Sequence, residues 1–572
     1  MKVLFLHVDY IKFKPLKKAL KNPPELTEKE KKEQRVDDAL VAMISVEKSD
    51  SDVKKVVSEL ARNVKDIADQ VKAKNVVLYP YAHLSSSLSS PEIAIKVLEE
   101  SEEKLKKEFK VTSAPFGYYK EFELKVKGHP LSELSREIRL EETGNIVKGS
   151  EEKYDHVQLL REISKSKLDT SKLKENDHRI IGQQMDLFSF NEVAPGMIFW
   201  HNNGLILYNE LINFWREVHR KSGYQEISTP QILDKRLWQI SGHWEKYKEN
   251  IFLTKYENRD FAVKPMNCPG AMLVFKSKSR SYKELPLRLS EIGVVHRQEL
   301  SGTLGGLFRV IRFTQDDAHL FCTEGQIEEE VEKVISMINL FYEKFGLQFD
   351  HVELSTRPEK RIGDEKLWDK AERALESVLK KKKMKYKINK GDGAFYGPKI
   401  DFHLKDSQGR TWQCSTVQLD FAMPQRFELE YVDSDNKRKT PVIIHRVIYG
   451  AIERFLGILI EEKNGRFPVW LAPTQVRVLS FTDRNVKYAE KIIKEISSEI
   501  PNLRIDADFQ NSTMQGKVKD AEIMRVPYII VVGDKEEKEK TIAVRIKGSS
   551  KIEKFTVDEL CIRLKKEIEE KK

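Results

Sequence analysis

The segment from Leu285 to Cys322 constrains the fold of this chain more than any other. It reads LPLRLSEIGVVHRQE, then LSGTLGG, then LFRVIRFTQDDAHLFC, which predicts two antiparallel strands joined by a glycine-rich loop. Arg297 and Glu299 close the first strand. Successive side chains of a strand point to opposite faces, so without a bulge four polar residues share one face of the second strand: Arg309, Gln315, Asp317 and His319.

A sheet face of this kind is a poor core. Arginines beside a carboxylate and an imidazole suit a zwitterionic ligand that carries phosphate, because a guanidinium binds phosphate in a bidentate way. The sequence has no G-x-x-x-x-G-K-[ST] loop and no G-x-G-x-x-G opening a helix, so phosphate must be held by other groups. The alternative is a solvated face, which antiparallel sheets often have.

Two further segments carry polar groups. In RTWQCSTVQLDF, alternation places Cys414, Thr416 and Gln418 on one face and Gln413 on the other. The run PVIIHR then leads into a predicted helix, VIYGAIERFLGILIEE, with Arg454 inside an apolar stripe. Its two glycines each cost a helix about 1 kcal/mol relative to alanine, which favours a ligand or another backbone close by. Helix packing alone would explain the glycines but not the arginine.

The length of 572 residues predicts two to four domains. Alternating strand-like and helical runs predict an α/β domain over residues 1–143, followed by a helical linker over 144–176. The largest domain is expected over 177–470, and a small α/β domain with a partly parallel sheet over 471–572. The predicted fold is therefore multidomain, mixed α/β and α+β.

Composition sets the class of protein. Apolar residues make up 40% of the chain and charged residues 33%, as in globular proteins. The net charge of +10 favours a polyanionic partner without proving one. Four scattered cysteines predict free thiols or metal ligands in a reducing compartment, and the start MKVLFLHVDYIKFK suits a strand better than a signal peptide or membrane span. We expect a cytoplasmic protein without membrane contact.

The middle of the chain closely resembles the class II catalytic domain of threonyl-tRNA synthetases. The resemblance rests on DHRIIGQQMDLFSF, APGMIFW, SGHWEKY, KPMNCPG, HRQELSGTLGGLFRVIRFTQDDAH, GAFYGPKIDF, WQCSTVQLDF and IHRVIYGAIERFLGIL. It implies a homodimer through motif 1, from about Leu205 to Pro230, and ATP bound with Mg²⁺. It also implies five catalytic residues: Arg297 at the α-phosphate, Arg309 at the triphosphate tail, Arg454 clamping ATP, Gln315 and Lys399.

The same resemblance implies one catalytic Zn²⁺ per subunit, held by Cys268, His319 and His445. Three protein ligands leave zinc open for the amino and hydroxyl groups of threonine, so valine, which lacks the hydroxyl, would be rejected. Asp317 would bind the substrate amino group. Four residues would complete the threonine pocket: Gln315, Tyr396, Gln418 and Gln413.

Serine differs from threonine by one methyl group, a distinction worth about 1 to 3 kcal/mol, so a second sieve is expected. Residues 1–143 resemble the editing domain of archaeal-type threonyl-tRNA synthetases, a relative of D-aminoacyl-tRNA deacylases, through LHVDYI, YPYAHLSS and APFGYYKEFELKVKGHPLSEL. Strand parity points Lys120 toward the interior, and Glu133 falls in a predicted first helical turn. The resemblance assigns both to the hydrolytic site, with His83 and Tyr119 shaping the pocket; a surface salt bridge is the alternative.

Residues 471–572 resemble the anticodon-binding domain of this family, which implies base contacts by Asn511, Glu536 and Arg545. The predicted function is threonyl-tRNA synthetase: the enzyme activates L-threonine with ATP to threonyl-adenylate, charges tRNA(Thr) and hydrolyses mischarged seryl-tRNA(Thr). Three positions depart from many relatives: Ala271, Gly305 and Ala451. The alternatives are an editing hydrolase acting in trans, with impaired charging, and a non-catalytic RNA-binding regulator; the intact zinc and arginine sets argue against both.

Overall fold

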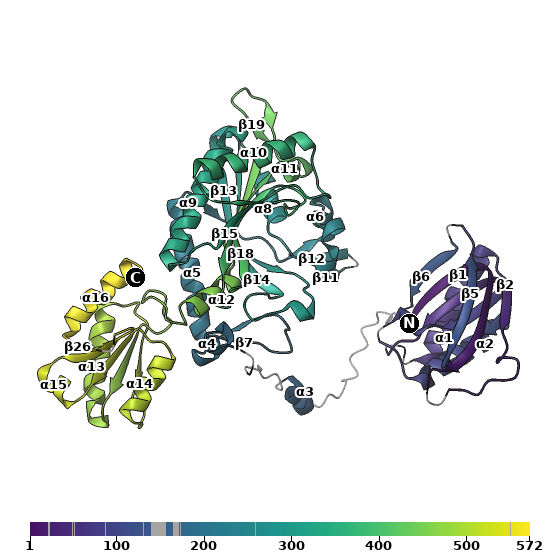
Figure 1. Cartoon of the computed structure of the whole chain (residues 1–572), viewed down its shortest axis with the longest axis horizontal. Helices are drawn as coiled ribbons and strands as arrows, with labels where there is room; N and C mark the ends of the chain where they lie inside the picture. Colours follow the sequence, from purple (N-terminus) through teal and green to yellow (C-terminus); the bar gives the residue numbers. More distant parts are fainter. Residues whose placement is uncertain are drawn as a thin grey trace. The chain divides into compact units, whose positions relative to one another are not determined.

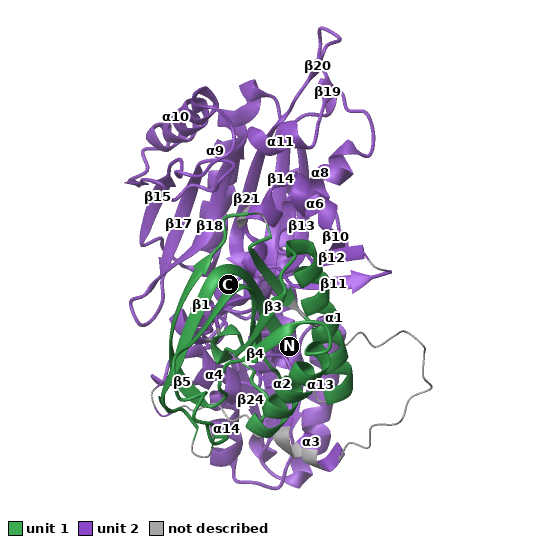
Figure 2. Cartoon of the chain, turned by 90° about the vertical axis from the view of Figure 1, so that its right-hand side faces the viewer, with its two compact units in different colours: residues 1–153 green, residues 154–572 purple. Residues whose placement is uncertain are grey.

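The computed structural model divides the chain into two compact units, residues 1–153 and 154–572 (Figures 1 and 2). It describes residues 1–20, 23–48, 50, 52–85, 87–129, 131–138, 156–163, 171, 173–257, 259–549 and 551–572. Within the predicted linker, helix α3 (His156–Ile163) is described. The rest of that linker up to residue 170, and residue 172, lies outside the described residues.

The first unit is built on a mixed sheet of order β4-β3-β2-β1-β5, with β6 also paired to β1. β1 runs antiparallel to β2, β5 and β6, whereas β2, β3 and β4 are parallel. The strands are β1 Lys2–Lys18, β2 Gln34–Ser45, β3 Asn75–Pro80, β4 Lys110–Ser113, β5 Tyr118–Val126 and β6 Glu133–Glu137. This is the α/β unit that the sequence predicts.

Two helices cover one face of this sheet, α1 (Val53–Val71) and α2 (Pro91–Leu105). Asp52 caps α1 by accepting a hydrogen bond from the Lys55 amide at 3.2 Å, and Pro91 occupies the first turn of α2, where a missing N–H costs nothing. Apolar residues of both helices pack against alternate residues of the strands, so this face of the sheet forms the main core of the unit.

The predicted helical turn at Glu133 is wrong. Glu133 opens strand β6 and pairs with Leu6 of β1. The reason is that β5 hydrogen-bonds one edge of β1 from Val8 onward, which leaves the Lys2–Leu6 part of that edge unpaired, and β6 satisfies it. The carboxylate is therefore not stabilised by a helix dipole.

The second unit contains an eight-stranded sheet of order β16-β15-β17-β18-β21-β14-β13-β9. The predicted hairpin is confirmed, since β13 and β14 are antiparallel over an unbroken register from Leu287↔Phe321 to His296↔Arg312. The strands are β9 Gln225–Glu226, β13 Leu287–His296, β14 Arg312–Cys322, β15 His351–Ser355, β16 Lys387–Asn389, β17 Lys399–Lys405, β18 Thr411–Asp420 and β21 Val442–Ala451.

Smaller pieces surround this sheet. Three short sheets pair β7 Phe188–Ser189 with β8 Phe199–Trp200, β10 Ile232–Asp234 and β11 Leu253–Tyr256 with β12 Arg259–Val263, and β19 Tyr431–Val432 with β20 Arg438–Lys439. The helices are α4 His178–Gln184, α5 Asn202–Lys221, α6 Lys235–Ile240, α7 His243–Lys246, α8 Cys268–Lys276, α9 Ile327–Phe345, α10 Glu365–Lys381, α11 Ala422–Arg426 and α12 Ile452–Glu462.

The alternation of β14 separates core from site. Ala318, Leu320 and Cys322 belong to the large core that also contains residues of α5, α9 and α12. Asp317 and His319, which alternate with these residues, face the opposite side of the sheet, where they line a cavity. One strand therefore serves the core and a polar site at once.

The predicted helix over 447–462 is partly wrong, because its first five residues belong to strand β21 and α12 starts at Ile452. Opposite Gln315 and Asp317 of β14, β21 carries extra residues that form a bulge. The Asp316 carboxylate holds the bulge by accepting hydrogen bonds from the amides of Ile448 and Gly450, each at 2.9 Å. A long-range carboxylate thus overrides the local helical pattern.

The C-terminal part of the second unit has a sheet of order β23-β22-β24-β25-β26, parallel for β23, β22 and β24 and antiparallel for the rest, as predicted (Figure 1). Its elements are β22 Val476–Ser480, α13 Val486–Glu499, β23 Ile505–Asp508, α14 Met514–Ile523, β24 Tyr528–Val532, α15 Asp534–Glu539, β25 Ile542–Ile546, β26 Ile552–Phe555 and α16 Val557–Glu569. Among the described residues, no helix is both long and apolar enough to cross a membrane.

Candidate functional site

Two cavities lie on the polar face of the eight-stranded sheet, one of about 420 Å³ and one of about 300 Å³. They share lining residues from β14, β18, β21 and the end of β13: Arg297, Gln315, Gln413, Thr416 and Val447. A ligand in one cavity therefore lies beside a ligand in the other. The sizes suit a nucleotide phosphate group and a small amino acid.

The larger cavity carries three arginines, Arg297, Arg309 and Arg454, with Glu299 in the same lining. Arg454 is fixed by donating from Nε to the Phe308 carbonyl at 2.9 Å and from Nη1 to the Gln413 carbonyl at 3.0 Å. Burial and the nearby charges of Arg309 and Arg297 lower the pKa of Arg454 below its ordinary value. Three guanidinium groups of like charge repel one another, and a bound polyanion would relieve that repulsion.

Arg309 lies outside β14, in a turn closed by the bridge between Gly305 and Arg309, and donates from Nε to Glu299 at 3.0 Å. The expectation that it shares the β14 face is therefore wrong, although it still reaches the larger cavity. The reason is that the connection between β13 and β14 runs from residue 297 to 311, longer than LSGTLGG alone.

The smaller cavity has a buried carboxylate at its base. Asp317 accepts a hydrogen bond from Asn267 Nδ2 at 3.2 Å, and burial raises its pKa to about 6. Gln418 donates to the Gly397 carbonyl at 3.1 Å, and the ring of Tyr396 is tilted against that of His445, with centroids 5.4 Å apart. A buried carboxylate at this position is suited to accept a hydrogen bond from the amino group of a ligand.

The prediction that Gln413 lies on the opposite face from Thr416 is wrong. A register shift between β17 and β18 leaves Cys414 unpaired, so β18 bulges and Gln413 turns to the side of Thr416, to which it donates at 2.8 Å. Both side chains donate to Asp401 Oδ1, at 2.6 and 2.8 Å. Lys399 also contacts Asp401. Burial opposes the charge of Lys399, but Asp401 and Asp392 raise its pKa.

Cys268, His319 and His445 meet beside the smaller cavity, with potential ligand atoms within 4.8 Å of one another and all three side chains buried. His319 and His445 are direct cross-strand neighbours on β14 and β21, and Cys268 is the first residue of α8. Cysteine and histidine side chains are the ligands that zinc prefers in proteins.

The surroundings of the three residues fit a metal ion. The buried His319 Nε2 has no hydrogen-bond partner among the described residues, and burial lowers the His319 pKa well below its ordinary value, which keeps the ring neutral. His445 Nε2 lies 3.0 Å from Asp420 Oδ2, the contact that commonly orients a ligating imidazole. Burial raises the pKa of Cys268 well above its ordinary value, which a bound cation would reverse.

Sequence reasoning missed three residues of this site: Asn267, Asp401 and Arg446. Asn267 and Arg446 each adjoin a predicted zinc ligand in sequence, so their positions gave a usable signal. Asp401 contacts Lys399 of its own strand, but its hydrogen bonds from Gln413 and Thr416 come from β18, and the sequence did not reveal them. Of the three departing positions, Ala271 is fully buried in α8, and a methyl group added at Gly305 would meet nothing within 4 Å.

The first unit has its own cavity, of about 430 Å³, and the structure brings His83, Tyr119 and Lys120 to it. Lys120 and Phe122 both line it, as their shared parity predicts. Lys120 Nζ donates to the carbonyls of Pro115 and Tyr118 at 2.8 and 3.2 Å, and burial lowers its pKa to about 8. Glu133 does not belong to this lining.

The C-terminal residues are not gathered in one pocket. Arg545 lines a basic cavity of about 350 Å³ with Arg466, Arg525 and Lys547, and donates to Glu522 at 2.7 Å. Glu536 caps its own helix by accepting from the Gly533 amide at 3.0 Å, and Asn511 lies exposed before α14.

Three family models match the chain. The archaea-specific editing domain of threonyl-tRNA synthetase matches residues 1–138, the tRNA synthetase class II core domain (G, H, P, S and T) residues 252–463, and the anticodon binding domain residues 475–567. The boundaries that we predict at residues 143, 176 and 470 remain predictions.

Relatives and solved structures agree with these matches. The chain is 53% identical to a threonine-tRNA ligase of Natranaerobius thermophilus over 69% of this chain and 62% of the relative, so it spans less than two thirds of that protein. It is 46% identical to a threonine-tRNA ligase of Caldanaerobacter subterraneus subsp. tengcongensis, over 84% of this chain and 76% of the relative.

Two solved structures resemble the chain. The RNA binding domain of threonyl-tRNA synthetase from Cryptosporidium parvum Iowa II has a TM-score of 0.66 and 41% identity, over 68% of this chain and 98% of that one. A putative threonyl-tRNA synthetase, ThrRS-1, from Aeropyrum pernix has a TM-score of 0.60 and 29% identity, over 68% of this chain and 96% of that one. With its fold, its paired cavities and these matches together, the chain belongs to the threonyl-tRNA synthetase family.

Proposed function

We propose that this protein is a threonyl-tRNA synthetase that also edits its product. The observation that carries the proposal is the junction of an arginine-lined cavity with a smaller cavity that holds Asp317 and the Cys268, His319 and His445 set. This arrangement suits the joining of an amino acid to a nucleotide phosphate.

The cavity that each residue lines indicates its role in the reaction. Arg297 and Gln315 line both cavities, so they would hold the α-phosphate where the threonine carboxylate attacks it. Arg309 and Arg454 line the larger cavity and would bind the remaining phosphates of ATP, which carries Mg²⁺. A bond forms between the carboxylate oxygen and the α-phosphorus, the bond to the β-phosphate oxygen breaks, and pyrophosphate leaves. The terminal hydroxyl of tRNA(Thr) then takes the threonyl group and AMP leaves.

Specificity would come from the smaller cavity. Asp317 would accept a hydrogen bond from the substrate amino group, while Tyr396, Gln413 and Gln418 would enclose the substrate side chain. Cys268, His319 and His445 would hold one Zn²⁺ per subunit, a Lewis acid that binds the threonine amino and hydroxyl groups. Valine lacks the hydroxyl and would be rejected, whereas serine would be accepted too often.

The first unit would remove the serine error. Its cavity carries a lysine whose lowered pKa suits proton transfer near neutral pH, and Lys120, His83 and Tyr119 lie together there. We propose that this cavity binds the seryl end of mischarged tRNA(Thr), with Glu133 an assignment that rests on resemblance alone. Asn511, Glu536 and Arg545 would contact the anticodon, and we expect a homodimer in the cytoplasm.

The test is amino-acid-dependent ATP–pyrophosphate exchange by the full chain, with threonine, serine and valine compared. We expect strong exchange with threonine, weaker exchange with serine and little with valine. Cys268→Ser should abolish exchange, while Cys561→Ser, a buried cysteine of α16 outside both cavities, should keep it. Absence of exchange with retained hydrolysis of seryl-tRNA(Thr) would refute the proposal and favour an editing hydrolase that acts in trans.

A further inference from the structure

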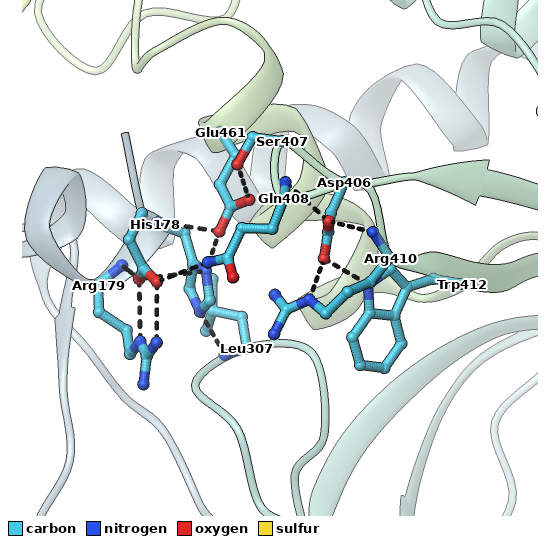
Figure 3. A network of polar contacts seen from close by, with 10 residues as sticks. His178, Arg179, Leu307, Asp406, Ser407, Gln408, Arg410, Trp412 and Glu461 are labelled. Atoms are coloured by element: carbon cyan, nitrogen blue, oxygen red, sulfur yellow. Dashed lines mark hydrogen bonds and ion pairs between the residues drawn. The ribbon is translucent and has the colours of Figure 1, made fainter. Parts of the chain in front are cut away.

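A buried polar network ties together four segments that lie far apart in the sequence (Figure 3). Its centre is His178, the first residue of α4, which is 1% exposed. Around it lie Glu461 at the end of α12, Leu307 in the loop between β13 and β14, and the turn between β17 and β18 that contains Asp406 and Ser407. We call this set the His178 network.

Both ring nitrogens of His178 are engaged. Nδ1 lies 2.7 Å from Glu461 Oε1, and Nε2 lies 3.0 Å from the Leu307 amide nitrogen. An amide N–H can only donate, so Nε2 must be the acceptor and Nδ1 must carry the ring proton toward the carboxylate. The contacts thus define one neutral tautomer. With both nitrogens used, the nearby carboxylates of Asp177 and Glu461 do not make this trio a metal site.

The loop is shaped around the imidazole. Gly306 has φ +53°, and a methyl group added there would lie 2.1 Å from His178 Nε2. On the other side, Ser407 Oγ donates to the second oxygen of Glu461 at 2.6 Å. This hydrogen bond orients the Glu461 carboxylate, which in turn orients the His178 ring. Asp177 caps α4 and pairs with Arg179 at 2.8–2.9 Å, so the helix that presents His178 is itself anchored.

The network ends in the arginine-lined cavity. Leu307 is followed directly by Phe308 and Arg309, and all three line that cavity. The Phe308 carbonyl accepts the hydrogen bond from Arg454 Nε at 2.9 Å, and the Phe308 ring stacks on Trp412 with centroids 5.0 Å apart. Trp412 Nε1 in turn donates to Asp406 Oδ2 at 2.8 Å. The position of the Leu307 amide therefore affects two of the three cavity arginines.

We propose that His178 is a positioning residue: by accepting the Leu307 amide hydrogen bond, it fixes the turn that orients Arg309 and Arg454 toward the phosphates of ATP. The identity of the ligand, ATP, rests on the proposed function. The hydrogen bond between His178 and the Leu307 amide does not depend on it. The proposal assigns a role in the reaction to the start of α4, although no residue of this helix lines either cavity. Loss of the anchor should weaken ATP binding and leave threonine binding unchanged, because no residue of the network lines the smaller cavity.

Two variants separate the two sides of the ring. In His178→Asn, the amide nitrogen can replace Nδ1 as donor to Glu461, but nothing reaches Leu307. In His178→Gln, the amide oxygen can replace Nε2 as acceptor for Leu307. Glu330→Gln is the matched control, because it breaks a buried ion pair with Arg288 (2.6 Å) that contacts neither the loop nor the cavities.

Hydrogen exchange of residues 300–311 in the full chain is the first readout. We expect about tenfold faster exchange in His178→Asn, equal to about 1.4 kcal/mol of lost local protection, near wild-type exchange in His178→Gln, and no change in this segment for Glu330→Gln. Unchanged loop exchange in His178→Asn overturns the proposal, whether or not the protein is active.

ATP–pyrophosphate exchange is the second readout. The KM for ATP should rise at least about fivefold in His178→Asn, or about 1 kcal/mol, with the KM for threonine unchanged and rescue by His178→Gln. If both KM values or kcat alone changed in all three variants, His178 would be merely structural and the proposal wrong. Absence of ATP–pyrophosphate exchange in the wild type would refute the proposed function. Hydrogen exchange of residues 300–311 would still test whether His178 fixes the loop.

Discussion

Replacing Gly450 by alanine should destabilise the second unit, and the structure gives the reason in two parts. Gly450 has φ +81°, a conformation that costs a residue with a Cβ about 1–2 kcal/mol. The added methyl group would also lie 2.4 Å from the Cys414 carbonyl oxygen. That atom is backbone of the neighbouring strand β18, so relief requires β18 and β21 to move apart, at about 1–3 kcal/mol. The expected cost is about 2–5 kcal/mol.

Two other glycines serve as matched controls. Gly409, in the exposed turn between β17 and β18, has φ +82° but nothing within 4 Å of an added methyl group, so Gly409→Ala should cost only the conformational part, about 1–2 kcal/mol. Gly305 has neither feature, so Gly305→Ala should change stability by less than about 0.5 kcal/mol. The three substitutions therefore separate backbone strain from steric overlap.

The assay is calorimetry of the full chain, in which the melting temperature of the second unit is compared among the three variants at one scan rate. We expect the order Gly450→Ala lowest, then Gly409→Ala, then Gly305→Ala close to wild type. The helical interpretation of residues 447–462 makes the opposite prediction, because alanine in a helix is about 1 kcal/mol more favourable than glycine. A Gly450→Ala protein that melts at or above the wild-type temperature would refute the bulge.

Two further predictions concern the cavities. Hydrolysis of seryl-tRNA(Thr) should rise about fivefold between pH 7 and pH 8, about twofold more by pH 9, and then level off, because burial lowers the pKa of Lys120 to about 8 and the amine loses its proton as the pH rises through that value. Lys120→Met should show no such rise once spontaneous deacylation is subtracted, and a flat wild-type profile would contradict a neutral lysine base. Arg454→Lys should raise the KM for ATP about 10-fold to 100-fold, since lysine cannot keep both carbonyl contacts and face phosphate, with threonine binding within about twofold of wild type. Equal losses for both substrates would contradict this role.

The alternation of residues in the sequence predicted the face of each side chain correctly where strand pairing is regular. The β13–β14 register is unbroken, so alternation correctly placed Gln315, Asp317 and His319 on one face. The same argument worked for Lys120 and Phe122 on β5. In these strands, the face of each side chain follows from position alone.

Prediction failed where a distant group decides the backbone. The bulge of β21 depends on the Asp316 carboxylate and the bulge of β18 on its pairing with β17, and neither partner is visible in the local sequence. Glu133 was wrongly predicted in a helical turn, because it pairs with a stretch of β1 that β5 leaves unpaired. Spacing could not reveal the zinc set, whose members begin α8 and lie on β14 and β21; only the family resemblance suggested it.

Removal and return of zinc tests whether Cys268, His319 and His445 hold a metal ion that threonine activation needs. The full chain would be stripped with a chelator, titrated with Zn²⁺, and assayed at each point for bound zinc and for threonine-dependent ATP–pyrophosphate exchange. We expect one zinc bound per wild-type chain, exchange activity that rises in proportion to bound zinc, and loss of both in Cys268→Ser. Full threonine-dependent exchange by the zinc-free protein, with valine still rejected, would contradict this expectation.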